Sequence, residues 1–143
     1  MSQNEFPITF DPKPSLEDIG VLNTGLSAYA KEKKDLDPIE PFAFFVKDQK
    51  GQILAGCSGD IIYGCLYTGS LWVSESIRGK GVGTRLLKAA EQFALEKGCT
   101  MATINTMDWE ALEFYQSLGY KVDLAREGYK NNSTFYFLKK ELV

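Results

Sequence analysis

The stretch from Leu71 to Lys97 constrains the fold of this chain more than any other part of the sequence. Its apolar start, Leu71-Trp72-Val73, has the aromatic and β-branched character of a strand. The segment 78–83 follows, and its three glycines within five residues argue against regular structure there. From Thr84 the apolar side chains recur at helical spacing, and Gly98 stands where helices commonly end. The stretch therefore predicts a strand, a glycine-rich loop and an amphipathic helix.

A glycine-rich loop that opens a helix is suited to binding an anion. Missing side chains let the backbone approach a ligand, and the N–H groups of the first helical turn point at it along the helix dipole. Arg78 and Lys80 add positive charge. The loop lacks the Gly-Lys-Ser/Thr ending of nucleoside-triphosphate loops, and its glycines are one residue too closely spaced for the dinucleotide fingerprint. A phosphate or pyrophosphate of another kind of ligand is therefore expected.

Two blocks of sequence resemble a known family. Arg78, Gly81 and Gly83 fit Arg-x-x-Gly-x-Gly after an apolar strand, which resembles the coenzyme A loop of the GNAT superfamily of N-acetyltransferases. Residues 108–120, DWEALEFYQSLGY, are similar to the second block of that family, Asn-x-x-Ala-x-x-Phe-Tyr-x-x-x-Gly-Phe/Tyr, with Asp108 where Asn is usual. The resemblance covers roughly residues 42–140, and two blocks in the right order are more specific than either alone.

The resemblance implies acetyl-CoA as the acyl donor. By the same resemblance, the pantetheine arm lies in a wedge between two parallel strands that splay apart near Val73. Asp108 stands where the family usually has asparagine, and its contact with the coenzyme is in doubt because a carboxylate repels phosphates. The coenzyme-binding residues implied are Leu71, Trp72, Val73, Arg78, Gly79, Lys80, Gly81, Val82, Gly83, Thr84, Asp108, Ala111, Phe114 and Tyr115.

Removing a proton from the acceptor amine requires a base. A lysine-like amine has a pKa near 10.4, so only about one molecule in 10³ is neutral at pH 7. The chain has no histidine, which leaves carboxylates near the strand ends, Glu75 and Asp60, as catalytic candidates. Tyr63 and Tyr67 are candidates for a relay through water. Each of these residues is more typical of a surface or a turn than of a catalytic base.

Tyr115 is the candidate acid. The resemblance implies that the tyrosine of the Phe-Tyr pair points toward the coenzyme sulfur and protonates it; the alternative is that Tyr115 only packs its helix against the sheet. The Val73 backbone N–H is expected to stabilise the oxyanion, because a splayed strand leaves it unpaired.

Taken in order, the chain predicts an α+β (mixed α/β) fold. The resemblance adds a GNAT-like architecture, with a central, mostly antiparallel twisted sheet, one parallel splayed strand pair and about three to four flanking helices. The expected elements are a strand at 8–10, a helix capped by Ser15 and ending near Lys33, strands at 42–47, 52–63 and 71–73, a helix from Thr84, a strand at 100–105, a helix at 108–118 capped by Asp108, and a hairpin of 120–124 with 134–138 across a long polar turn.

Length, charge and cysteine spacing limit the domain organisation, the partners, the location and the metal content that we expect. At 143 residues and 44% hydrophobic, the chain is expected to form a single domain, 1–143. A net charge of −3 argues against partners such as nucleic acid or an anionic membrane. No apolar run has transmembrane length and no signal core is evident, so a cytoplasmic location is expected. Cys57, Cys65 and Cys99 show no metal spacing, so no metal is expected. Formation of a homodimer stays open.

The expected function is transfer of an acetyl group from acetyl-CoA to a primary amine by direct attack in a ternary complex. The segment 35–41 is either a solvated linker or, by resemblance, the lip of the acceptor site, where Asp35, Asp37 and Glu40 would attract a cation. Two alternatives stay open: a non-catalytic sensor or scaffold that binds acyl-CoA, and an enzyme that acetylates a protein N-terminus or lysine.

Overall fold

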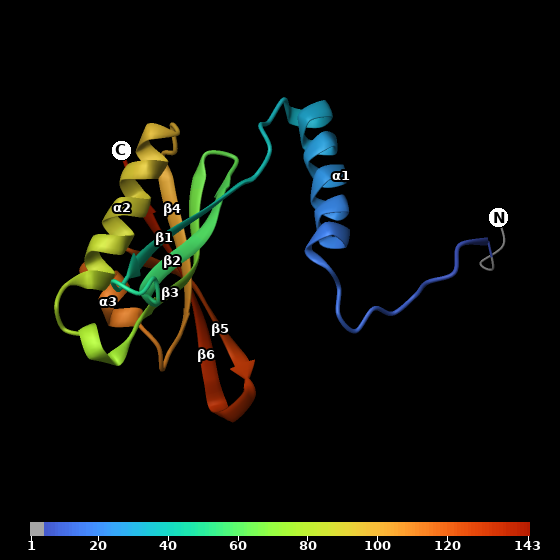
Figure 1. Cartoon of the computed structure of the whole chain (residues 1–143). Coiled ribbons are helices and arrows are strands. Elements are labelled where there is room, and N and C mark those ends of the chain that lie inside the picture. Colours follow the sequence, from blue (N-terminus) through green and yellow to red (C-terminus); the bar gives the residue numbers. More distant parts are fainter. Residues whose placement is uncertain (1–4) are drawn as a thin grey trace. The chain divides into compact units, whose positions relative to one another are not determined.

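The computed structural model describes residues 5–143, and the chain divides into two compact units, Met1–Pro38 and Ile39–Val143 (Figure 1). The first unit contains helix α1, Leu16–Lys34, which confirms the expected helix. The Ser15 side chain accepts a 3.0 Å hydrogen bond from the Asp18 backbone N–H and so caps that helix. The expected strand at 8–10 is wrong, because these residues adopt no regular secondary structure.

The second unit is built on a six-stranded sheet in the order β1-β2-β3-β4-β6-β5. The parallel pair β3–β4 is flanked by antiparallel pairs, which confirms the predicted fold class. The elements of this unit are β1 Glu40–Lys47, β2 Ile53–Ile62, β3 Cys65–Val73, the 3₁₀ helix η2 Glu75–Ile77, α2 Val82–Glu96, β4 Met101–Met107, α3 Leu112–Ser117, β5 Lys121–Tyr129, the short turn η3 Lys130–Asn132 and β6 Ser133–Glu141.

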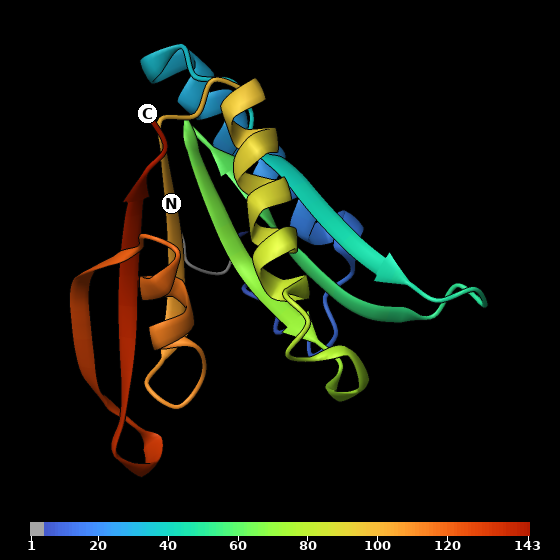
Figure 2. The same cartoon turned by 90° about the vertical axis from the view of Figure 1, so that its left-hand side faces the viewer.

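Helix α2 lies across one face of the sheet, with α3 beside it (Figure 2). Its apolar stripe includes Leu86, Leu87, Ala90 and Ala94, which are buried against the strands. On its outer flank Glu91 accepts hydrogen bonds from the Tyr120 hydroxyl at 2.8 Å and from the Lys140 ammonium at 2.9 Å. Such a partly buried, charge-assisted network fixes α2 against the C-terminal half of the sheet.

Strands β3 and β4 form a fork. They pair only from Cys65 to Thr68 on β3 and from Met101 to Ile104 on β4, and then separate. At the same level β3 bulges, because Ser58 pairs with Ser70 and Gly59 with Thr68, which leaves Gly69 without a partner on β2. The splayed parallel pair that the resemblance implied is therefore present.

Several boundaries differ from the sequence-based predictions, and among the strands the largest difference is that β3 begins at Cys65 rather than Leu71. Helix α2 begins at Val82 rather than Thr84, because Gly81 takes the N-cap position and only the glycines before Val82 break regular structure. Helix α3 begins at Leu112, so Asp108 does not cap it; the Asp108 N–H instead donates to the Thr134 carbonyl at 2.9 Å. The final hairpin is longer, and its turn shorter, than expected, since Asn131 and Asn132 adopt positive φ and reverse the chain tightly.

The structure also bears on membrane-spanning helices and on metal sites. Within residues 5–143, no helix combines the length and the apolar character needed to cross a membrane. Nor do the described residues gather three or more histidine, cysteine, aspartate or glutamate side chains into a set that could hold a metal ion.

Candidate active site

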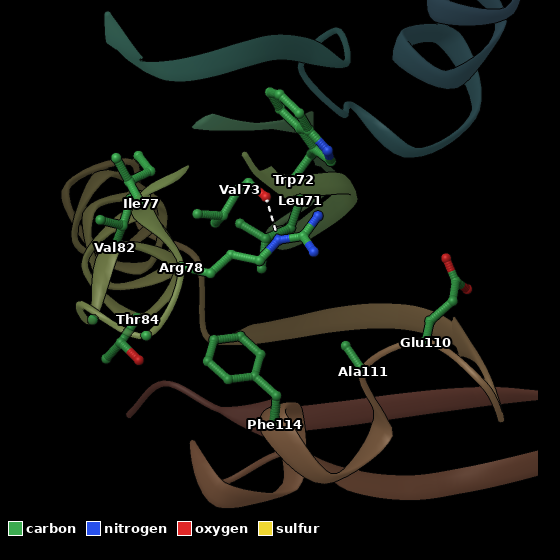
Figure 3. Close-up of a pocket in the computed structure, with 13 residues that line it drawn as sticks. Leu71, Trp72, Val73, Ile77, Arg78, Val82, Thr84, Glu110, Ala111 and Phe114 are labelled. Atoms are coloured by element: carbon green, nitrogen blue, oxygen red, sulfur yellow. Dashed lines mark hydrogen bonds between the residues drawn. The ribbon is translucent and has the colours of Figure 1, made fainter. Parts of the chain in front are cut away.

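A cavity of about 680 Å³ lies where the glycine-rich loop, the fork and α3 meet (Figure 3). Strand β3, the loop after it, the first turn of α2 and the start of α3 each contribute to its wall. The lining residues are Leu71, Trp72, Val73, Ile77, Arg78, Gly79, Gly81, Val82, Gly83, Thr84, Glu110, Ala111 and Phe114. The two sequence blocks, distant along the chain, thus face one cavity.

The three glycines of the loop have different structural roles. Gly79 and Gly81 have φ angles of 74° and 76°, a conformation that other residues rarely adopt. Gly83 lies inside α2, and a Cβ there would stand 3.3 Å from Phe114 Cζ, so its missing side chain lets α3 approach α2. Gly81 provides no side-chain cap and the first turn of α2 carries no acidic residue. The N–H groups of this turn therefore remain available to an anion in the cavity.

The free edge of β3 forms the other wall. The Ser74 N–H donates to the Leu54 carbonyl at 2.8 Å, so in the alternating antiparallel pattern the backbone polar groups of Val73 and Leu71 point away from β2, toward the fork. Arg78 Nε donates to the Val73 carbonyl at 2.8 Å (Figure 3). This places the Arg78 side chain against the end of β3, whereas the sequence suggested that it adds charge beside the anion.

The base of the fork holds an unsatisfied polar group. Thr68, the last β3 residue paired with β4, is 3% exposed, and its hydroxyl has no hydrogen-bond partner among the described residues. Thr106, beyond the pairing on β4, is also buried, but its hydroxyl accepts from the Ala111 N–H at 3.2 Å. Because an unpaired buried hydroxyl costs about 1–3 kcal/mol, a polar ligand atom at this point would be favourable.

Most of the implied coenzyme-binding residues line the cavity. Among the described residues, Lys80, Asp108 and Tyr115 are the implied ones that do not. Sequence reasoning missed Ile77 and Glu110, which do line it. Glu110 carried no signal because it occupies an unspecified position of the second block, where its carboxylate accepts from the Met107 N–H at 2.8 Å.

Tyr115 lies behind the cavity wall. It is 7% exposed, and its ring packs against Phe114 at 5.4 Å and Tyr120 at 6.1 Å between centroids. Burial, reinforced by the nearby charge of Glu110, raises the pKa of Tyr115 to about 12. The phenol therefore keeps its proton throughout the physiological range.

The carboxylate candidates stand apart from the cavity. Asp60 pairs in register with Tyr67 and lies on the sheet face opposite α2, while Glu75 is exposed in η2. Glu40 forms an ion pair of 3.1 Å with Lys97, at the C-terminal end of α2. Since a helix of 15 residues is roughly 22 Å long, Glu40 is remote from the glycine loop, and a role of the segment 35–41 as the lip of the acceptor site stays a prediction.

Comparison with known proteins identifies the family to which this chain belongs. The family model described as "Acetyltransferase (GNAT) family" matches residues 13–120. The chain is 34% identical over 106 residues to a blasticidin-S acetyltransferase from Streptomyces morookaense, covering 73% of this chain and 78% of that protein. The chain belongs to the GNAT acetyltransferase family, and it is an acyltransferase.

Two solved structures share the fold. A protein from Agrobacterium tumefaciens assigned as an acetyltransferase superposes with a TM-score of 0.83 at 24% identity, over 95% of this chain and 99% of that one. A Bacillus anthracis protein assigned as a streptothricin acetyltransferase, solved in complex with acetyl coenzyme A, gives 0.64 at 18% identity, over 71% and 62%.

Proposed function

We propose that the protein transfers the acetyl group of acetyl-CoA to a primary amine by direct attack in a ternary complex. The observation that carries the proposal is a single cavity that joins the uncapped start of α2 to the free edge of β3 at the fork. The amine nitrogen forms a bond to the thioester carbonyl carbon, and the C–S bond breaks with its electron pair on sulfur. The nitrogen loses one proton and the sulfur gains one.

The cavity suits the parts of the coenzyme. The pyrophosphate of the coenzyme would accept hydrogen bonds from the N–H groups at the start of α2, and Lys80 in the glycine-rich loop adds a nearby positive charge. The amides of the pantetheine arm would pair with the open backbone edge of β3, as an added strand does. The Val73 N–H would then face the thioester oxygen. Asp108 lies outside the lining, so we assign it no phosphate contact.

The proton-transfer groups follow from the same placement. We assign the role of base to Asp60 or Glu75. Because neither side chain lies in the cavity wall, the base would act through a water molecule. Tyr115 is the acid for the departing thiolate: its raised pKa keeps it protonated, and its ring packs against Phe114, which lines the cavity.

Replacing Tyr115 by Phe tests the role of the hydroxyl. The ring and its packing are kept, so the melting temperature and the affinity for acetyl-CoA should change little, while kcat falls on the order of 10²-fold. Single-turnover kinetics with acetyl-CoA and a saturating amine measures the chemical step. Turnover within about twofold of wild type, with stability lost only in Tyr115→Ala, would reduce Tyr115 to a packing residue.

Release of free coenzyme A from acetyl-CoA, measured against polyamines, amino sugars, amino acids and peptides, tests the function as a whole. Turnover with a small amine supports the proposal, and turnover with peptides alone supports a protein acetyltransferase. Coenzyme binding without turnover of any amine would support a non-catalytic acyl-CoA sensor.

The family match runs across the boundary between the two units, so we propose that 1–143 is one acetyltransferase domain. We also propose a cytoplasmic location, which fits three buried free cysteines.

A further inference from the structure

The fork has a second side. Along β4 the residues that face α2 and α3 are buried at 102, 104 and 106, so Thr103 and Asn105 face the opposite side of the sheet. Tyr67 lies on that opposite side too, because its neighbours Leu66 and Thr68 are buried on the α2 side. The two sides of the fork therefore present different side chains, and only the α2 side carries the cavity assigned to the coenzyme.

The ring of Tyr67 lies along β3 toward the point where the strands separate. A Cβ built on Gly69 would stand 3.3 Å from Tyr67 Cε2 and 3.8 Å from its hydroxyl oxygen. The ring thus covers the bulged glycine, which is the first β3 residue beyond the pairing with β4. This brings the phenol oxygen to the base of the fork.

Asn105 holds that oxygen from the other strand. Its side-chain Nδ2 donates to the Tyr67 hydroxyl oxygen at 3.3 Å, and Asn105 is the first β4 residue beyond the last pair, Thr68 with Ile104. This hydrogen bond joins a side chain of β3 to a side chain of β4 across the fork. Because Asn105 occupies only one lone pair, the second lone pair and the hydrogen of the phenol remain for a ligand.

We propose that the amine approaches the thioester from the sheet face opposite α2, and that Tyr67 and Asn105 position it there. This inference rests on the proposed function. An N–H of the amine donates to the Tyr67 oxygen, which aims the nitrogen lone pair at the carbonyl carbon. The proton lost on attack passes to Asp60, the cross-strand neighbour of Tyr67 on the same face, through water. Tyr67 contacts the reacting nitrogen, and Asn105 is a positioning residue that acts through Tyr67.

A double-mutant cycle tests this arrangement. Tyr67→Phe should lower kcat/KM for the amine about 30-fold, as expected for one hydrogen bond to a group that develops charge. Asn105→Ala should lower it about 10-fold in the wild type and hardly further in Tyr67→Phe, because the amide acts only through the phenol. The control Thr103→Val changes the same face of β4 two residues before Asn105, and it should leave kcat and kcat/KM for the amine within about twofold of wild type. The affinity for acetyl-CoA, measured by calorimetry, should stay within about twofold in every variant.

The outcomes separate the inference from the function on which it rests. Additive losses from Tyr67→Phe and Asn105→Ala, or losses that follow the melting temperature, would assign the pair to structure and overturn the inference. Unchanged amine kinetics in Tyr67→Phe would overturn it as well, while leaving acetyl transfer intact. A wild-type protein that binds acetyl-CoA but acetylates no amine would overturn the proposed function and this inference together.

Discussion

Replacing Gly59 by Ala is expected to prevent stable folding of the sheet. A Cβ at this position would lie 1.8 Å from the Tyr67 carbonyl oxygen and 2.9 Å from Thr68 Cα, both of them backbone atoms that no side-chain movement can clear. The bulge of β3 would have to move, and with it the fork. We expect a loss of more than about 3 kcal/mol of unfolding free energy, in the range of the most damaging single substitutions. Chemical denaturation followed by circular dichroism measures it.

Ser58→Ala is the matched control for that variant. Ser58 is the preceding residue of the same strand, on the other face, and the change keeps a Cβ while it removes only a hydroxyl. It should shift stability by less than about 1 kcal/mol. Equal stability of the Gly59→Ala and Ser58→Ala proteins would show that β2 and β3 adapt and that the bulge does not depend on a glycine.

Replacing Thr84 by Glu is expected to abolish coenzyme binding without harm to the fold. Thr84 lines the cavity in the first turn of α2, where an acidic residue favours the helix dipole by about 0.3–1 kcal/mol. The same carboxylate would repel the pyrophosphate. Two unit charges about 4 Å apart near a protein surface repel by about 4 kcal/mol, so affinity for acetyl-CoA should fall roughly 10³-fold.

Thr84→Gln separates charge from bulk in this experiment. The amide has nearly the size of the carboxylate, and it should retain affinity within about tenfold of wild type. If the two variants bind acetyl-CoA equally well while the melting temperature of Thr84→Glu is at least that of wild type, the pyrophosphate does not bind at the start of α2.

The sequence predicted those features that local chemistry determines. The glycine loop is recognisable because Gly79 and Gly81 need positive φ, and the amphipathic stripe of α2 is visible as a helical repeat. The hairpin of β1 and β2 followed from the turn at residues 48–51. In each case the physical cause lies within a few residues of its effect.

What the sequence did not reveal depends on contacts between distant residues. Arg78 folds back onto Val73, and the helix after β4 starts late, because Thr106 rather than Asp108 receives the Ala111 N–H. The pairing of Tyr67 with Asn105 exists only once β3 and β4 lie side by side. One missed feature did have a local signal: the Asn131-Asn132 pair is typical of a tight hairpin turn with positive φ.

Calorimetric titration of the wild-type protein with acetyl-CoA tests the central claim most directly, because the cavity at the fork is assigned to that molecule before any acceptor is considered. We expect one molecule bound per chain with a dissociation constant in the micromolar range, and weaker binding as salt screens the charges at the loop. Absence of binding up to about 1 mM acetyl-CoA, in a protein whose circular dichroism shows the folded sheet, would contradict the account.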